Sequence, residues 1–365
     1  MNFRSIANLN QVIVAALPRV PRDFDLVVGI PRSGLLAANM LALHLNLPLT
    51  DMRGLIQKRL LQSGRRMGDA RTDFFDRVCK VLVVDDSVNS GNAMQRAREE
   101  LTAAGLDYEL VYAACYVTNE SQHLVDLWLE VVPTPRVFEW NVMHQDLLGE
   151  CCVDIDGVLC RDPSHEENDD GPLYREFLTN VEPLFLPTVK VGALVSARLE
   201  KYRPETEAWL ARHGVEYDEL LLLDLPDARA RRAAACHGSH KAEAYRDRNA
   251  MLFIESDALQ AAEIARLASR PVLCIGTRRM YYPDSLLTDA SAFARHKANR
   301  LVTKVRKKLK RLFERGLQRK PVEEDPALVD EAHRPLDTRE TKQVQREPED
   351  SRTKKDARES VRLTR

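Results

Sequence analysis

Long hydrophobic runs are missing from this sequence of 365 residues, of which 44% are hydrophobic and 6% aromatic. A membrane-spanning helix needs about 18 or more consecutive apolar residues. The richest stretch, residues 35–49, is broken by two asparagines, a histidine and a proline. A secretory signal is missing too, because the first residues, MNFRSIANLNQ, hold no basic segment followed by an apolar one. The sequence therefore predicts neither a membrane-spanning nor a secreted protein.

Cysteine is scarce and offers no disulfide framework. Seven cysteines are an odd number, and they lack the spacing of metal ligands. They stand at positions 79, 115, 151, 152, 160, 236 and 274. We expect reduced thiols in a cytoplasmic protein, because disulfides are rare in that compartment.

Acidic and basic residues are unevenly distributed along the chain. Residues 295–365 hold 22 Lys and Arg against 13 Asp and Glu, whereas residues 1–294 hold 32 against 42. This asymmetry predicts an acidic globular body with a basic appendage. At roughly 150 residues per domain, the length indicates two domains.

Strand-like and helix-like runs alternate along the body, which is typical of α/β domains with mainly parallel sheets. In the first half, strands are expected at 25–30, 80–84 and 110–117, and helices at 33–45 and 91–104. In the second half, strands are expected at 151–155, 191–195, 220–223, 251–254 and 272–275, and a helix at 204–213. The prediction is two consecutive three-layer α/β domains, residues 1–148 and 149–290.

The basic appendage divides into two segments. Residues 291–320 are predicted to form a basic amphipathic helix, because apolar residues at helical spacing stand among dense Lys and Arg. Residues 321–365 have few apolar residues and mixed charges, so we expect a disordered tail. The helix suits weak contact with nucleic acid, an anionic membrane or the chain's own acidic body, or it packs on the second domain.

The first candidate site is the segment VLVVDDSVNSGNA, residues 81–93. An apolar strand leads to two adjacent carboxylates and then to a small polar loop that opens a helix. Backbone N–H groups of such a loop can surround a phosphate, and carboxylates can accept hydrogen bonds from sugar hydroxyls. The pattern indicates a sugar-phosphate site; the alternative is that both acids only cap a turn.

This segment resembles the signature of the type I phosphoribosyltransferases, which bind 5-phosphoribosyl 1-diphosphate (PRPP). The resemblance covers residues 1–148 and implies that Asp85 and Asp86 hold the ribose hydroxyls. It implies that the 5-phosphate is held by Ser87, Val88, Asn89, Ser90, Gly91, Asn92 and Ala93. The sequence departs from the family at Asn89, where a small residue, often threonine, is usual.

Two further segments extend the resemblance. A short loop after the first strand looks like the diphosphate-binding loop of the family, and it consists of Pro31, Arg32, Ser33 and Gly34. Its arginine would neutralise phosphate charge, and its glycine would allow close backbone approach. Residues 57–72 are polar and basic and resemble the flexible loop that closes over the active site; a plain surface loop is the alternative.

The second candidate site combines four separated segments. The segment CCVDIDGVL, residues 151–159, ends an apolar strand with two carboxylates two residues apart. Ser196 follows the next strand, Lys241 begins a helical segment, and Glu255 and Asp257 follow a later strand. Acids for Mg²⁺, together with a hydroxyl and a cation for phosphate oxygens, make a set suited to phosphoryl transfer.

This series resembles the haloacid dehalogenase-like phosphatases over residues 151 to about 280. The resemblance implies that Asp154 is the nucleophile and Asp156 the general acid or base. Ser196 and Lys241 would bind the phosphoryl group. Mg²⁺ would be held by Asp154, Asp156 and one of Glu255 and Asp257, and the short span between Cys160 and Ser196 predicts a small cap.

Together the two resemblances predict a bifunctional enzyme. It would transfer phosphoribose from Mg-PRPP to an unidentified small-molecule acceptor and hydrolyse a phosphomonoester, with the two reactions in sequence as one option. The alternative is a PRPP-binding sensor without transferase activity, which regulates the phosphatase or a nucleic-acid contact. A homodimer is left open.

Overall fold

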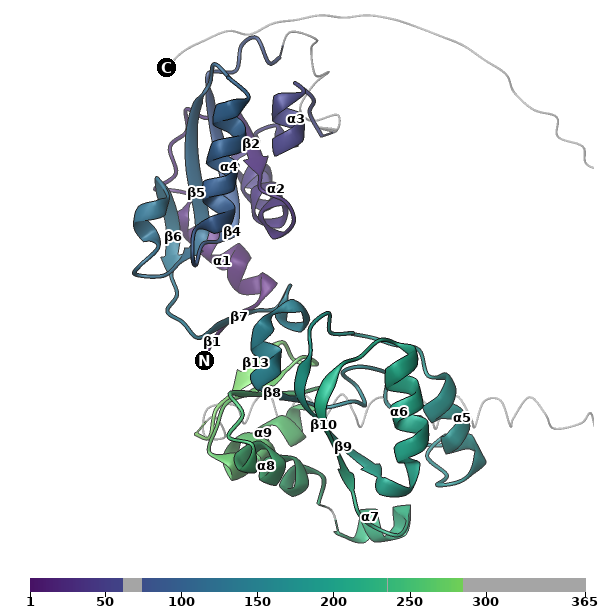
Figure 1. Ribbon diagram of the computed structural model, residues 1–365. Helices are drawn as coiled ribbons and strands as arrows, with labels where there is room; N and C mark the ends of the chain where they lie inside the picture. The colour runs from purple at the N-terminus through teal and green to yellow at the C-terminus, as the bar shows by residue number, and fades with distance from the viewer. Residues whose placement is uncertain (62–73, 235, 285–365) are drawn as a thin grey trace, which may run out of the picture. The chain divides into compact units, whose positions relative to one another are not determined.

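The structure is a computed structural model that describes residues 1–61, 74–234 and 236–284. Strands and helices alternate along most of this length (Figure 1). The helices are α1 (Ile6–Ala16), α2 (Ser33–Leu45), α3 (Met52–Ile56), α4 (Asn92–Ala103), α5 (Pro172–Asn180), α6 (Arg203–Arg212), α7 (Ala228–Ala234), α8 (His237–Asp247) and α9 (Ala258–Ala268). Short 3₁₀ turns are η2 (Gln122–Leu124), η3 (Val142–His144), η4 (Asp146–Glu150) and η5 (Glu200–Tyr202).

The strands form two large sheets and one small pair. They are β1 (Asn2–Arg4), β2 (Leu26–Gly29), β3 (Leu49–Asp51), β4 (Lys80–Ser87), β5 (Glu109–Val117), β6 (Leu127–Val131), β7 (Arg136–Phe138), β8 (Cys151–Val153), β9 (Val191–Leu199), β10 (Tyr217–Leu223), β11 (Leu252–Glu255), β12 (Val272–Cys274) and β13 (Arg279–Tyr281). The first sheet has the order β3-β2-β4-β5-β6, and the second has the order β10-β9-β8-β11-β12-β13. The small pair consists of β1 and β7. Among the described strands, every pairing is parallel except that of β12 with β13.

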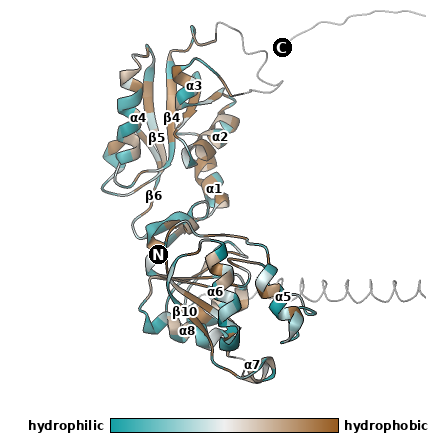
Figure 2. Ribbon diagram, turned by 45° about the vertical axis from the view of Figure 1, so that its right-hand side comes forward, coloured by the Kyte–Doolittle hydropathy of each residue, from teal (hydrophilic) through white to brown (hydrophobic). Residues whose placement is uncertain are grey.

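The first sheet is buried on both faces because side chains alternate along each strand. On β4, Leu82 and Val84 join a core with α1 and α2, whereas Val81 and Val83 join a second core with α3 and α4. The result is a three-layer arrangement, and Figure 2 shows the hydrophobic colour concentrated in the strands.

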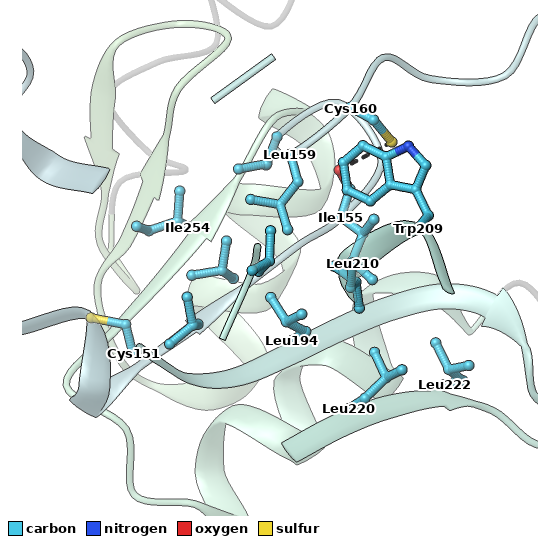
Figure 3. Packing of buried hydrophobic residues seen from close by; sticks show 14 of the residues in the cluster. Cys151, Ile155, Leu159, Cys160, Leu194, Trp209, Leu210, Leu220, Leu222 and Ile254 are labelled. Carbon is cyan, nitrogen blue, oxygen red and sulfur yellow. Dashed lines mark hydrogen bonds between the residues drawn. The ribbon is translucent and has the colours of Figure 1, made fainter. Parts of the chain in front are cut away.

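The second sheet has the same three-layer construction. Ile254 of β11 packs with α5 and α6 on one face, and its neighbour Phe253 packs with α8 and α9 on the other. Figure 3 shows Leu194, Ile254 and Trp209 in the first of these two cores. The indole N–H of the fully buried Trp209 donates to the Val181 carbonyl at 2.8 Å, so even this polar atom is satisfied.

The expected α/β class with mainly parallel sheets is confirmed, but several boundaries were wrong, and three of them concern the candidate sites. Strand β4 was expected to end at Val84, yet it pairs with β5 as far as Ser87. Strand β9 was expected to end before Ser196, yet it continues to Leu199. Helix α8 begins at His237, so Lys241 lies inside the helix and not at its start. Strand β4 runs on because β5 continues to supply partners in register, whereas β9 pairs with β10 again at Leu199 only after a shift in register.

Several predictions lie wholly or mostly outside the described residues. These are the basic helix at 291–320, the tail at 321–365 and most of the loop at 57–72. Within the described ranges, no helix combines the length and apolarity needed to cross a membrane. All seven cysteines are free thiols.

Candidate functional site

The loop after β2 lies directly against the acids of β4. Strands β2 and β4 are neighbours, so their carboxyl ends meet at one edge of the sheet. A methyl group added at Gly34 would lie 2.8 Å from the Val84 carbonyl oxygen and 2.9 Å from Oδ1 of Asp85. Only glycine allows this approach. Pro31 and Arg32, joined by a cis peptide bond, are exposed beside it.

Asp85 and Asp86 are nearly covered, with 6% and 3% of their surface exposed. Adjacent strand residues face opposite sides of a sheet, so the two carboxylates do not point the same way. Oδ1 of Asp85 accepts the N–H of Asp86 at 2.9 Å. Burial, and then the neighbouring charge of Asp86, raise the pKa of Asp85 to about 8. The burial of this pair therefore favours the protonated form of Asp85.

A tryptophan that the sequence did not connect with this pair holds Asp86. The indole Nε1–H of Trp140 donates to Oδ2 of Asp86 at 2.8 Å. Its ring stacks on Phe138 with centroids 5.0 Å apart, and Phe138 stacks on Tyr116 at 5.3 Å. The structure adds a hydrogen bond that orients an acid.

The loop between β4 and α4 is fixed at its start. The Val88 N–H donates to the Tyr116 carbonyl at 2.8 Å. The Val88 carbonyl accepts hydrogen bonds from the Ser121 hydroxyl and from Nη2 of Arg136, both at 2.8 Å. Val88 is thus buried and held in place, and nothing in the sequence distinguished it from its exposed neighbours.

The second half of this loop opens helix α4 toward solvent. Gly91 occupies the N-cap with φ of +81°, and no side chain caps the helix. The exposed residues of the segment are Asn89, Ser90, Asn92 and Ala93. Uncapped N–H groups at the start of a 12-residue helix can bind an anion, helped by the helix dipole.

The second cluster centres on a buried ammonium group. Nζ of Lys241 lies 2.7 Å from Oδ2 of Asp154 and 2.7 Å from Oε2 of Glu255, and 3.0 Å from Oε1 of Gln260. The three charged residues are 0–3% exposed. Burial raises the pKa of Asp154 well above its usual range, although the charge of Lys241 opposes this. Burial alone would lower the pKa of Lys241, but the two carboxylates outweigh it and raise that pKa.

Asp156 forms an ion pair that the sequence did not predict. Nη2 of Arg198 lies 2.7 Å from its Oδ1 and Nε lies 3.1 Å from its Oδ2. Arg198 is fully buried. Burial would raise the pKa of Asp156, but the charge and hydrogen bonds of Arg198 lower it. The signal was an arginine two residues after Ser196 in the same strand.

The remaining predicted residues have contrasting positions. Ser196 is fully buried within β9, and its Oγ accepts the N–H of Arg198 at 3.2 Å. Oδ1 of Asp257 caps α9 by accepting the N–H of Leu259 at 2.9 Å. Oε1 of Glu255 accepts the N–H of the next residue at 2.9 Å, which fixes its carboxylate beside Lys241. Of the two acids left open by the sequence, Glu255 therefore lies in the buried cluster, and Asp257 caps its helix.

The fit of Mg²⁺ to this cluster can be judged from the donor atoms. Within the described ranges, no three side chains of His, Cys, Asp or Glu are grouped as a metal would need. Asp154 and Glu255 do face a common point, which the ammonium of Lys241 occupies. The backbone carbonyl of Asp156 accepts the hydroxyl of Ser256, the residue after Glu255, at 3.4 Å. Carboxylates are oxygen donors of the kind that Mg²⁺ prefers, so Asp154 and Glu255 would have to exchange the ammonium of Lys241 for the ion.

Comparisons with known proteins concern the part of the chain that holds Asp85 and Asp86. Residues 4–147 match the family model of the phosphoribosyl transferase domain. Among solved structures, the xanthine-guanine-hypoxanthine phosphoribosyltransferase of Helicobacter pylori has 18% identity, covers 39% of this chain and 92% of its own, and has a TM-score of 0.29. The purine phosphoribosyltransferase of Pyrococcus horikoshii has 19% identity, 38% and 92% coverage, and a TM-score of 0.28. The orotate phosphoribosyltransferase of Aeropyrum pernix has 21% identity, 34% and 70% coverage, and a TM-score of 0.24.

No curated protein matches the chain. The resemblance of residues 151–280 to the haloacid dehalogenase-like phosphatases stays a prediction, and so do the individual site residues. The match over residues 4–147 concerns the sheet that carries Asp85 and Asp86. The family model of the phosphoribosyl transferase domain thus matches the N-terminal part of the chain, residues 4–147.

Proposed function

We propose that the chain is a bifunctional enzyme. Residues 1–148 would bind Mg-PRPP and transfer its phosphoribosyl group to a small-molecule acceptor. Residues 149–290 would hydrolyse a phosphomonoester with Mg²⁺. The observation that carries the first half is the contact of Gly34 with Asp85, which joins the two expected PRPP-binding loops at one sheet edge.

In the transfer reaction, each loop has a distinct task. Asp85 and Asp86 accept hydrogen bonds from the ribose hydroxyls, and the N–H groups at the start of α4 hold the 5-phosphate. The loop at residues 31–34 holds the diphosphate. A nitrogen or oxygen of the acceptor bonds to ribose C1 while the C1–O bond breaks, and diphosphate leaves with the bonding electron pair.

A double substitution tests PRPP binding. Asp85→Asn with Asp86→Asn should abolish PRPP binding in isothermal titration, because neutral amides replace both acceptors. Asp107→Asn is the control, since Asp107 is an exposed acid of the same domain. Unchanged PRPP affinity in the double variant would reject the assignment.

The alternative is a PRPP sensor, and Asn89 is the observation that favours it. This residue is exposed on the phosphate loop, where the family usually has a smaller side chain. A panel of acceptors with PRPP decides between the two, because only an enzyme releases diphosphate. PRPP binding without diphosphate release from any acceptor would favour the sensor.

The second half rests on the buried contacts of Lys241 with Asp154 and Glu255. In hydrolysis, the Asp154 carboxylate attacks phosphorus and the ester P–O bond breaks. Asp156 donates a proton to the leaving oxygen. Water then attacks the aspartyl phosphate and releases inorganic phosphate. Bound Mg²⁺ would supply charge neutralisation for the phosphoryl oxygens, and Asp154, Glu255 and the Asp156 carbonyl would hold it.

The two reactions can be tested for sequence on one substrate. Phosphoribosyl transfer leaves a 5-phosphate on its product, and a linked phosphatase meets that product at raised effective concentration. Asp154→Asn should therefore stop at the phosphorylated ribosyl compound, whereas the unsubstituted enzyme should go on to the dephosphorylated one. Mass spectrometry of the products of both enzymes tests this. If both enzymes give the same product, the two activities do not act in sequence on this substrate.

The basic appendage has a proposed partner as well. A salt-dependent contact with nucleic acid or an anionic membrane would follow from its charge. A chain ending at residue 294 should lose this binding. If the shortened chain binds equally well, the appendage is not the segment that binds the nucleic acid or membrane.

A further inference from the structure

Arg231 of α7 is a buried cation outside the cluster described above. It is 7% exposed. Its Nη2 donates to Oδ1 of Asn168 at 2.8 Å and its Nη1 to the Ala197 carbonyl at 3.2 Å. Its Nε has no hydrogen-bond partner among the described residues. Tyr174 is a further neutral neighbour: burial raises the pKa of its hydroxyl, whereas the charge and a hydrogen bond of Arg231 lower it. The partners of Arg231 found in the described ranges are therefore neutral.

A buried cation with neutral partners is an unusual arrangement. Removing a charge from water costs several kcal/mol unless a charge of opposite sign compensates it. The hydrogen bonds satisfy part of the guanidinium. They leave its charge uncompensated, and its Nε–H has no hydrogen-bond partner among the described residues. An anion is the group that would complete this site.

The position of Arg231 is beside the proposed phosphatase cluster and not within it. Ala197, whose carbonyl it contacts, stands between Ser196 and Arg198 on β9. Burial lowers the pKa of His237, and the charges of Arg231 and then Lys241 lower it further, so this ring lies near both cations.

The same guanidinium is tied to the segment expected to form the small cap. Asn168 supplies one of its partners. Oδ2 of Asp170 accepts the N–H of Ala228 at 2.9 Å, which anchors the start of α7 to the same segment. Arg231 thus lies between the cap segment and β9, where its partner Ala197 is the neighbour in sequence of Ser196.

We propose that Arg231 binds a second phosphate group of the phosphatase substrate, so that the substrate class is a sugar bisphosphate. The product of the transfer reaction belongs to this class only when its acceptor carries a phosphate. Ser196 and Lys241 already serve the reacting phosphoryl group in the proposed function, on which this inference rests. The planar fork of a guanidinium matches phosphate oxygens, and its free N–H adds a further donor.

A matched pair of sugars tests the inference. Ribose 1,5-bisphosphate and ribose 5-phosphate differ by one phosphate. The unsubstituted enzyme should prefer the bisphosphate in kcat/KM by about 10- to 100-fold, the range expected for charge-assisted hydrogen bonds. Arg231→Gln should remove the preference and leave kcat/KM for ribose 5-phosphate within about twofold. Arg229→Gln is the control, because Arg229 is exposed on the same helix.

The outcomes separate the inference from the proposed function. Equal losses for both sugars in Arg231→Gln, or no preference in the unsubstituted enzyme, would overturn the inference. If neither sugar is turned over, the phosphatase proposal fails, and isothermal titration of the two sugars decides the inference. Tighter binding of the bisphosphate that depends on Arg231 would support it, and equal binding of both sugars would overturn it.

Discussion

The hydrogen bond from Trp140 to Asp86 gives the sharpest prediction for the first site. Trp140→Phe removes the only indole donor on this carboxylate among the described residues and keeps an aromatic ring against Phe138. Asp86 is 3% exposed, so water cannot easily replace the donor. We expect the substitution to destabilise the fold and to release the carboxylate from its fixed orientation.

The magnitude follows from the charge of the acceptor. Hydrogen bonds to charged groups contribute about 1.5–3 kcal/mol, and this range corresponds to roughly 10- to 150-fold in an equilibrium constant. The ring stack is largely kept, so most of the loss should come from the hydrogen bond. The unfolding free energy should fall by about 1.5–3 kcal/mol, and PRPP affinity should weaken because Asp86 no longer presents a fixed acceptor.

Urea unfolding followed by circular dichroism measures the first effect, and isothermal titration with Mg-PRPP measures the second. Trp128→Phe is the control, because Trp128 is 36% exposed on β6. If Trp140→Phe behaves like Trp128→Phe in both measurements, the indole does not orient Asp86 and the reasoning is refuted.

Three further predictions concern single residues. Because the pKa of Asp85 is raised to about 8, PRPP affinity should rise as the pH increases through that value, and Asp85→Asn should flatten this profile. The raised pKa exceeds that of the unfolded chain, so the stability of the fold should fall with rising pH between about 4 and 8. Gly34→Ala should weaken PRPP binding in titration through its overlap with Asp85, whereas Gly149→Ala, whose added methyl meets only one atom at 3.9 Å, should not. Lys241→Met should lower the unfolding free energy in urea by about 3–5 kcal/mol, because it leaves two buried carboxylates without their cation; an unchanged midpoint would contradict the described ion pairs.

Much of the fold could be predicted because its strands are short apolar runs with clear ends. Helix α2 has the predicted bounds, since Pro31 precedes it and Asn46 ends it in the left-handed conformation. The pairing of β1 with β7 could not be predicted, because each strand has three residues and the partners are far apart in sequence. Strand ends were also missed where a polar residue continues a ladder, as Asp86 does in β4.

The candidate sites were predictable only where local pattern decides position. Both acid pairs stand at or near the carboxyl ends of strands, as their apolar runs indicated. The partners of these acids could not be predicted, because Trp140 lies 54 residues from Asp86 and Arg198 lies 42 residues from Asp156. Such contacts depend on packing between elements, which a single sequence does not encode at a fixed spacing.

The anchoring of Val88 has a consequence for the kinetics of ligand capture. Its N–H and carbonyl are held by three hydrogen bonds of 2.8 Å to β5, the turn at residue 121 and the strand β7. Ordering a loop residue on binding costs about 1–2 kcal/mol of backbone entropy. If this loop binds a phosphate as proposed, its start is ordered before the ligand arrives, and that cost is confined to the few residues between Val88 and Gly91. Preorganisation of this kind favours a fast, single-step encounter with a phosphate over a slow rearrangement after binding.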